Sequence, residues 1–225
     1  MTLNIKDLVK TFDLPAGGGS LTVLDVPSFE IADAEQVVMI GESGGGKTTL
    51  LHLIAGLLAA DSGSINVNGT ELTRLSEQGR DRFRASVIGY VFQTFNLLPA
   101  FTALENIRLG MTFGHGRHDS ARAMDLLARV GLADRANYKP SQLSVGQQQR
   151  VAIARSLAGK PKLLLADEPT ANVDPVSAES VLDLIQTSCK DEGIALLMVT
   201  HSMEVAGRFE RVDRLEEINN AFAKN

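Results

Sequence analysis

The sequence contains very little cysteine and has no excess of basic residues. Cys189 is the only cysteine among 225 residues, so an intramolecular disulfide is impossible, as is typical of proteins in a reducing compartment. The 22 lysines and arginines are outnumbered by 27 acidic residues, which gives a net charge of −5. Nucleic-acid-binding proteins use a basic face to neutralise phosphates, so this balance argues against that class.

Long hydrophobic runs are also missing. The longest nearly apolar run covers residues 50–60 and includes His52, whereas a membrane-spanning helix needs about 20 consecutive apolar residues. The N-terminal segment MTLNIKDLVK lacks the apolar core of a signal peptide. We therefore expect a soluble chain, for which any membrane span would be supplied by a separate protein.

Apolar runs alternate with stretches of helical pattern through most of the chain. The uninterrupted runs predict buried strands of a parallel sheet covered on both faces, at residues 37–40, 87–92, 162–166 and 194–199. The stretches between them predict helices at residues 47–59, 120–130, 146–158 and 176–190. In the second of these helices, Asp119 and Ser120 offer an N-cap and Gly131 a C-terminal stop.

The N-terminal region has a different pattern. The segments LNIKDLVKTF and LTVLDVPSFEI, joined by PAGGGS, predict two antiparallel strands, and SGSINVNG predicts another short strand that ends in a turn. We therefore predict an α/β fold with a mostly parallel sheet, an antiparallel β flank and an inserted α-helical subdomain. The whole chain, 1–225, would form one domain, with a core of residues 1–93 and 146–225 and a helical subdomain of about 94–145.

A phosphate-binding motif follows the first predicted parallel strand. The segment GESGGGKTT starts at Gly41 and matches G-x-x-x-x-G-K-[ST] in the required strand–loop–helix context. Glycines let the backbone turn tightly and point its N–H groups inward, while the following helix adds its positive N-terminal end. We predict a P-loop core in which these residues bind ATP: Gly41, Glu42, Ser43, Gly44, Gly45, Gly46, Lys47, Thr48 and Thr49.

Two side chains of this motif have specific predicted roles. Lys47 would neutralise the β- and γ-phosphate oxygens, and the Thr48 hydroxyl would bind Mg²⁺. A glycine-rich turn of purely structural use is the alternative. The placement of Lys-Thr at a helix start after a buried strand argues against that alternative.

An acidic pair closes the strand in KLLLADEP. Adjacent side chains of a strand point to opposite sides, so one carboxylate can face a metal and the other the γ-phosphate. We assign Asp167 to Mg²⁺ and Glu168 to polarising the attacking water. Such a pair can also serve only as a helix cap, but the phosphate-binding motif favours the catalytic interpretation.

The segment QLSVGQQQRVAIARSLAGKPKLLLADEPTANVD, residues 142–174, resembles the block from the signature motif to the D-loop of ABC ATPases. The resemblance extends over nearly the whole chain. It implies an ATP-hydrolysing motor subunit on the cytoplasmic side of the inner membrane, with no nucleic-acid partner. Such a subunit forms a homodimer when ATP is bound and powers a separate transmembrane permease.

The resemblance also implies further site residues. The sequence LSVGQ corresponds to the signature motif, which opens a helix facing the ATP held by the other subunit; it comprises Ser144, Val145, Gly146 and Gln147. Val145 replaces a family glycine. Valine is acceptable there if its φ is negative and strained if φ is positive.

Four other positions match functional residues of the family. Gln93 corresponds to the Q-loop glutamine, which reaches Mg²⁺ or its water, and His201 to the switch histidine that contacts the γ-phosphate. Asp174 corresponds to the D-loop aspartate at the subunit interface. Phe12 lies where the family places an aromatic residue, usually tyrosine, under the adenine.

Within the family, the chain is most similar to one branch. The segments FQTFNLLPAFTALENI and ADEPTANVD resemble the lipoprotein-release and macrolide-exporter branch, which implies export or mechanical release of lipoproteins. The alternative is a cell-division-type ABC ATPase that gates a regulatory membrane partner. The tail RVDRLEEINNAFAKN departs from the family because it has no clear turn glycine.

Overall fold

The computed structural model describes residues 1–15, 18–115 and 119–223. The chain divides into two compact units, Met1–Asp81 with Ala195–Asn225, and Arg82–Ile194. Helix α2 (Glu77–Val87) contains the boundary between them. None of the helices formed by the described residues is long and apolar enough to cross a membrane.

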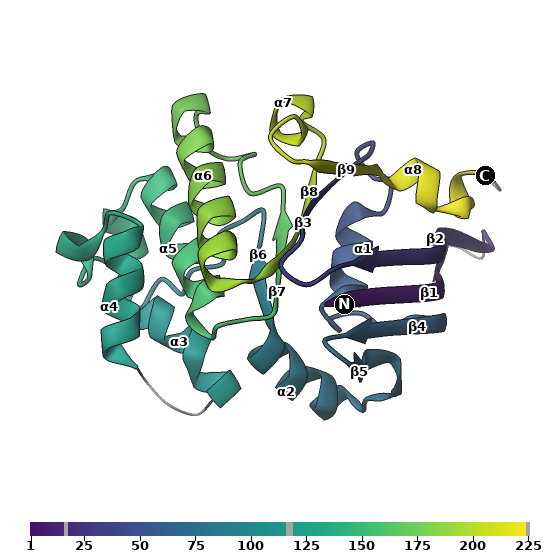
Figure 1. Ribbon diagram of the computed structural model, residues 1–225, viewed down its shortest axis with the longest axis horizontal. Helices are drawn as coiled ribbons and strands as arrows, with labels where there is room; N and C mark the ends of the chain where they lie inside the picture. The colour runs from purple at the N-terminus through teal and green to yellow at the C-terminus, as the bar shows by residue number, and fades with distance from the viewer. Residues whose placement is uncertain (16–17, 116–118, 224–225) are drawn as a thin grey trace. The chain divides into compact units, whose positions relative to one another are not determined.

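An antiparallel sheet in the first unit has the strand order β2-β1-β4-β5 (Figure 1). Its strands are β1 (Leu3–Asp13), β2 (Ser20–Ile31), β4 (Ser62–Val67) and β5 (Thr70–Glu71). β1 and β2 pair along their whole length, from Leu3 opposite Ile31 to Asp13 opposite Ser20. The predicted antiparallel pair is therefore confirmed, and β1 buries Leu3, Ile5 and Leu8.

Three parallel strands in the same unit pair in the order β8-β3-β9. They are β8 (Ala195–Thr200), β3 (Gln36–Ile40) and β9 (Arg211–Arg214). All six residues of β8 are buried, which is the burial expected of an uninterrupted apolar run in a parallel sheet. The helices of this unit are α1 (Lys47–Ile54), α7 (Met203–Ala206) and α8 (Leu215–Ile218).

Helix α1 is shorter than its sequence pattern predicts. We expected a helix to residue 59, but α1 ends at Ile54 and Ala55 is its C-cap. Gly56 has φ of 64°, and the amide of Leu57 donates to the carbonyl of His52. This left-handed glycine closes the helix, a common helix ending that we missed because the apolar pattern continues past it.

The second unit holds a parallel pair and four long helices. The strands are β6 (Ile88–Val91) and β7 (Leu163–Asp167). The helices are α3 (Ala103–His115), α4 (Ser120–Arg129), α5 (Val145–Ala158) and α6 (Pro175–Glu192). Helices α3 and α4 lie in the segment for which we predict a helical subdomain; the exact limits of that subdomain remain a prediction.

Caps and small residues explain the local geometry of these helices. The Asp119 carboxylate accepts the amide of Arg122 at 2.9 Å, so the predicted N-cap of α4 is confirmed. Gly131 follows α4 with φ of 71°. Helices α3 and α5 approach closely at Gly110, where a Cβ would lie 2.4 Å from the carbonyl oxygen of Arg155; only glycine fits there.

Candidate nucleotide-binding site

The phosphate-binding loop of the first unit connects β3 to α1. Gly44 and Gly46 have φ of 80° and 98°, which a residue with a side chain adopts only under strain. A Cβ on Gly46 would also lie 3.1 Å from a side-chain carbon of Val23, a residue of β2. Both glycines are therefore required by the shape of the loop.

The start of α1 offers an anion-binding end. Gly46 is the N-cap, and among the described residues no side chain caps this terminus or adds an acidic group to its first turn. The helix dipole favours negative charge at this end, as is typical of anion-binding helix starts. Buried Lys47 bends back over the loop, where its Nζ donates to the carbonyls of Gly41 and Glu42 at 2.7 and 2.8 Å.

His201 follows the strand next to this loop. Ile40 at the end of β3 pairs with Thr200 at the end of β8, so Gly41 and His201 leave neighbouring parallel strands at the same edge. His201 is exposed, and Ser202 after it caps α7 by accepting the amide of Val205. The fold therefore brings the predicted switch histidine to the edge that carries the phosphate-binding loop.

Phe12 lies on β1 opposite Leu21. The residue is 39% exposed, and the ammonium of Lys10 lies 5.3 Å from the ring centre. Such a cation is attracted to the face of an aromatic ring. Its role under adenine remains a prediction.

The acidic pair belongs to the second unit. Asp167 ends β7 and is buried; burial of Tyr90, with a smaller contribution from the charge of Asp167, raises the pKa of the Tyr90 hydroxyl. Glu168 has φ of 45°. A left-handed conformation is unusual for a residue other than glycine, asparagine or aspartate, and such strain is often found at functional sites.

A side-chain tether that sequence reasoning missed holds the chain after Glu168. Gln149 on α5 is 1% exposed, and its Nε2 donates to the carbonyl of Pro169 at 2.7 Å. The amide of Ala171 donates to the carbonyl of Glu168 at 3.1 Å. Gln149 lies two residues beyond the signature motif, so only its burial in the structure reveals this contact.

Gln93 leaves the neighbouring strand of that unit. Val91 in β6 pairs with Ala166 in β7, so Gln93 and the acidic pair lie at one edge. The side chain of Asn172 donates to the carbonyl of Gln93 at 2.7 Å. The predicted Q-loop and D-loop are therefore joined directly through a residue that we did not predict.

The Q-loop is also held from α5. Arg155 donates to the carbonyls of Phe95 and Asn96 at 2.8 and 2.6 Å. Burial lowers the pKa of the Arg155 guanidinium. Helix α5 therefore contacts the segments after both β6 and β7.

The signature motif forms the start of α5. Ser144 is the N-cap: its hydroxyl accepts the amide of Gln147, and the Gln147 side chain accepts the amide of Ser144. This reciprocal pair is a capping box, a signal that S-x-x-Q in the sequence contains and that we overlooked. Asp174 likewise caps α6 by accepting the amide of Ser177.

Val145 is the first residue of α5, so its backbone is helical and its φ is negative. The strained alternative for this substitution is therefore excluded, and its side chain is 50% exposed. At Gly146, a Cβ would make only an ordinary contact, 3.5 Å from the Ser177 hydroxyl. Packing within the chain does not require this glycine.

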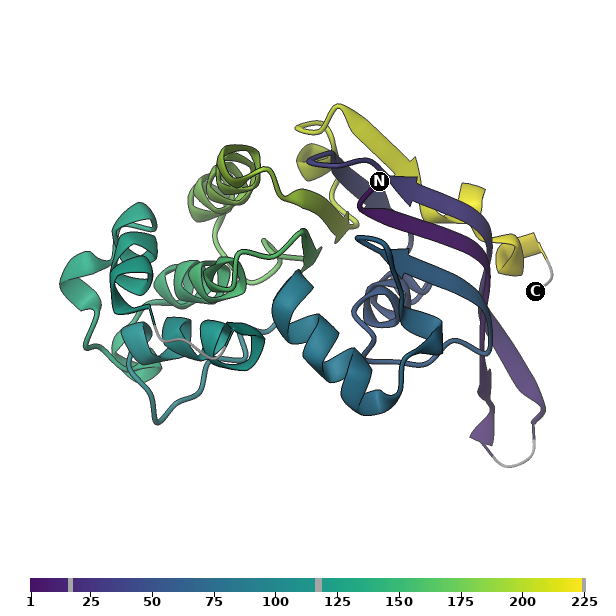
Figure 2. The same ribbon diagram turned by 60° about the horizontal axis from the view of Figure 1, so that its bottom comes forward.

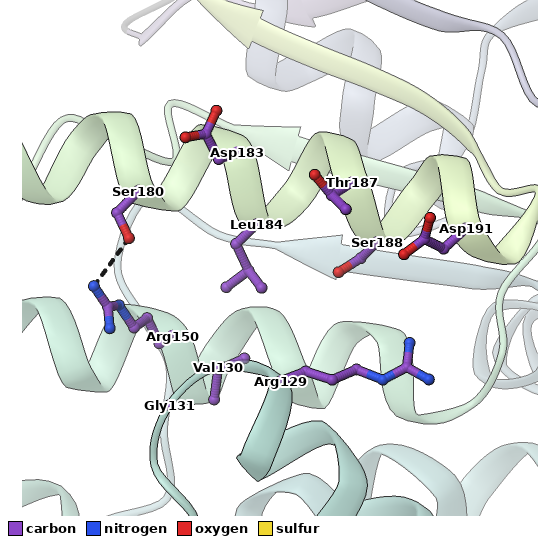
Figure 3. A pocket seen from close by; sticks show the side chains of 10 residues that line it. All are labelled: Arg129, Val130, Gly131, Arg150, Ser180, Asp183, Leu184, Thr187, Ser188 and Asp191. Carbon is purple, nitrogen blue, oxygen red and sulfur yellow. Dashed lines mark hydrogen bonds between the residues drawn. The ribbon is translucent and has the colours of Figure 1, made fainter.

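A groove of about 490 Å³ lies between α5, α6 and the end of α4 (Figure 3). Its lining includes Arg129, Arg150, Asp183 and Asp191, and Arg150 donates to the hydroxyl of Ser180 at 2.9 Å. Both charge signs are present and Arg129 is already paired with acidic neighbours. The residues described around this groove are not those predicted to bind nucleotide.

Comparison with known proteins decides the family. The family model described as "ABC transporter" matches residues 24–171. The chain belongs to the ABC transporter family. It is 42% identical to the lipoprotein-releasing system ATP-binding protein LolD 2 of Caulobacter vibrioides over 96% of this chain and 94% of the relative. LolD of Cereibacter sphaeroides is 44% identical over 88% of this chain and 89% of that protein.

A solved structure of another family member shares the fold. The ATP-binding cassette MJ0796, in a dimeric post-hydrolysis state with ADP and phosphate, superposes with a TM-score of 0.86 at 34% identity. The match covers 97% of this chain and 95% of that chain. These comparisons confirm the predicted fold class, an ATP-binding subunit of this family, and its similarity to the lipoprotein-release branch.

Proposed function

We propose that this chain is the ATP-hydrolysing motor of a lipoprotein-releasing transporter. The observation that carries the proposal is the phosphate-binding loop, which combines two left-handed glycines, an uncapped helix start and a buried lysine. The lipoprotein-releasing relatives, 42–44% identical over most of the chain, support this branch over the cell-division type.

We further propose that two copies bind ATP between them. The dimeric state of MJ0796 supports this arrangement, as does Gly146, whose missing side chain leaves room for a ligand near the start of α5. Each site would take its phosphate-binding loop from one copy and its signature motif from the other. The helix dipole of α5 would then add positive potential at the γ-phosphate.

The chemistry of hydrolysis is assigned to Glu168 of the second unit and to His201 of the first unit. Glu168 would accept a proton from the attacking water, and His201 would contact the γ-phosphate. For Mg²⁺, the candidate donors Thr48, Gln93 and Asp167 all present oxygen atoms. Among the described residues, no group of three or more His, Cys, Asp or Glu side chains could by itself hold a metal ion, so the proposed Mg²⁺ would also need oxygen atoms of the ATP phosphates.

A separate permease would convert this cycle into work. The absence of a membrane-spanning helix among the described residues is compatible with a peripheral subunit at the cytoplasmic face of the inner membrane. ATP would close the dimer, and hydrolysis with phosphate loss would reopen it. This motion, transmitted to the permease, would release the lipoprotein.

The direct test is nucleotide binding by a loop variant. Lys47→Ala should abolish measurable ATP binding in titration calorimetry with Mg²⁺, because the loop then lacks its side-chain cation. Lys6→Ala, which removes an exposed lysine of β1 in the same unit, is the matched control and should bind normally. Normal affinity of Lys47→Ala would show that nucleotide binds elsewhere.

A further inference from the structure

The segment after β9 lies against strand β2, as both Figure 1 and Figure 2 show. Instead of a glycine turn, it forms α8 and a 3-10 turn, Asn220–Ala223. The side chain of Asn219 is buried and fixes the segment: its Nδ2 donates to the carbonyl of Val23 at 2.9 Å. Its Oδ1 accepts the amides of Asp25 at 2.7 Å and Ala221 at 3.2 Å.

Glu216 of this segment contacts the start of the phosphate-binding loop. Its Oε1 accepts the amide of Glu42 at 2.9 Å. The same oxygen would lie 2.9 Å from a Cβ on Gly41, so the carboxylate occupies the space that a side chain at position 41 would need. The carbonyl of Glu42 accepts the ammonium of Lys47 and the amide of Gly45. Both backbone polar groups of Glu42 are therefore engaged.

Phe222 contacts the middle of the same loop. A Cβ on Gly45 would lie 3.1 Å from Cζ of the Phe222 ring. This distance is shorter than an ordinary van der Waals contact between carbon atoms. The ring also lines a cavity of about 100 Å³ with Leu21, Val23 and Gly44. Because Gly44 and the residue after Gly45 both have positive φ, Phe222 supports the part of the loop with the least intrinsic conformational preference.

We propose that Glu216 and Phe222 are positioning residues for the phosphate-binding loop. They hold its start and its middle from outside, so that the loop has its nucleotide-binding shape before ATP arrives. A loop rich in glycine loses much conformational freedom when it closes on a ligand, and ordering it beforehand raises affinity. This inference rests on the proposed function, because it requires that GESGGGKTT is the ATP site.

The contacts of the segment favour support over competition with ATP. Glu216 binds the amide of Glu42, at the start of the loop, and Phe222 packs on Gly45. Among the described contacts, neither side chain occupies the amides of the first turn of α1, where the phosphates are expected to bind. The carboxylate thus satisfies a loop amide without using those that form the predicted anion site.

The test compares binding of ATP with binding of inorganic tripolyphosphate, which has no base or ribose. Glu216→Ala and Phe222→Ala should each weaken both ligands by about fivefold, the loss expected for one hydrogen bond or one supporting contact. The affinity for both ligands should fall by the same factor, because the loop that binds their phosphates is less ordered. Glu216→Gln, which keeps an accepting oxygen, should restore most of the affinity.

Controls and a double-variant cycle separate the possible outcomes. Glu217→Ala and Leu57→Ala remove an exposed carboxylate and an exposed apolar side chain from the same unit and should bind normally. Gly45→Ala should weaken binding in the wild-type chain and weaken it less in Phe222→Ala, because the clash with the ring then disappears and only the approach to the carbonyl of Glu42, 3.2 Å from the new Cβ, remains. Melting curves confirm that each variant is folded.

Three results would overturn the proposal. In the first, Lys47→Ala loses ATP binding while Glu216→Ala and Phe222→Ala bind normally. The loop would then be the ATP site, but the segment after β9 would not influence it. If Phe222→Ala weakened the binding of ATP but not of tripolyphosphate, Phe222 would contact the adenine base instead of supporting the loop. Tighter binding of both ligands would show that the segment competes with nucleotide. Normal binding by Lys47→Ala would instead contradict the proposed function.

Discussion

The phosphate-binding loop and the segment after β7 hold their functional residues by different means. The loop is shaped by backbone conformation and by its own lysine, which donates to the carbonyls of Gly41 and Glu42. The segment that carries Glu168 is held by side chains from elsewhere, above all by Gln149 on α5. Local sequence therefore specifies most of the first region, to which Glu216 and Phe222 add contacts from outside, whereas the second depends on the helix that begins with the signature motif.

This difference has a functional consequence under the proposed dimer. The N-terminus of helix α5 would face the ATP of the partner copy. Five residues after the N-cap, Gln149 of the same helix binds the chain next to Glu168, the proposed catalytic glutamate. A shift of α5 would then move Glu168. The two regions should accordingly respond differently to mutation: the loop through ATP affinity and the α5-held segment through turnover.

The largest effect is expected from Glu168, the proposed catalytic carboxylate. Glu168→Gln should retain ATP binding and lower turnover by at least about 100-fold, because an amide cannot accept the proton of the attacking water. A stable ATP-bound dimer should accumulate, measured by light scattering. Glu179→Gln, an exposed position on α6, is the control and should turn over normally. A monomeric Glu168→Gln chain with normal turnover would refute the assignment.

The second largest effect is expected when the hydrogen bond from Gln149 to Pro169 is removed. Gln149→Met keeps the volume but removes the hydrogen bond to Pro169. We expect kcat to fall about tenfold with KM nearly unchanged, because a small displacement of Glu168 affects chemistry more than binding. Ser180→Ala breaks a different α5 contact, the bond from Arg150, and should change kcat much less. If Gln149→Met instead raised KM alone, the tether would act on nucleotide binding.

The smallest effect is expected at Val145. This residue is helical and half-exposed, so Val145→Gly should leave the fold intact and should not lower turnover. Glycine at a helix start can cost up to ~1 kcal/mol of unfolding free energy, which a melting curve would detect. A clear loss of activity in a folded Val145→Gly chain would show that valine itself contributes to the site.

The contrast between the two regions also explains what the sequence could predict. The phosphate-binding motif and the buried strands were predictable because they depend on neighbouring residues: glycine spacing, Lys-Thr at a helix start, and uninterrupted apolar runs. The ending of α1 was predicted wrongly because the apolar pattern continues past Gly56, which turns left-handed. Gly56 was therefore a local signal for the end of the helix, but the apolar periodicity was given more weight.

Long-range tethers could not be predicted in the same way. Gln149 and Pro169 are 20 residues apart, and the bonds from Arg155 to Phe95 and Asn96 span 60 and 59 residues. Glutamine and arginine on a helix are usually solvated, and their spacing gives no signal of a partner. The contact of Glu216 with the phosphate-binding loop, 174 residues away, belongs to the same class.

The central claim is that each ATP site combines a loop from one copy with a signature motif from the other. Mixed dimers of differently tagged Lys47→Ala and Gly146→Asp chains test it through steady-state ATP hydrolysis. Aspartate keeps the Ser144 cap and places a negative charge at the helix start proposed to face the γ-phosphate. Each variant should be inactive as a homodimer.

In a mixed dimer with two-fold symmetry broken only by these changes, one site carries both lesions and the other carries neither. Hydrolysis should therefore recover to about half of the wild-type rate per dimer if the two sites act independently. A mixed dimer of wild-type and Lys47→Ala chains, which also holds one intact site, shows what a single site can do. If that dimer hydrolyses ATP and the Lys47→Ala with Gly146→Asp dimer does not, the shared site is contradicted.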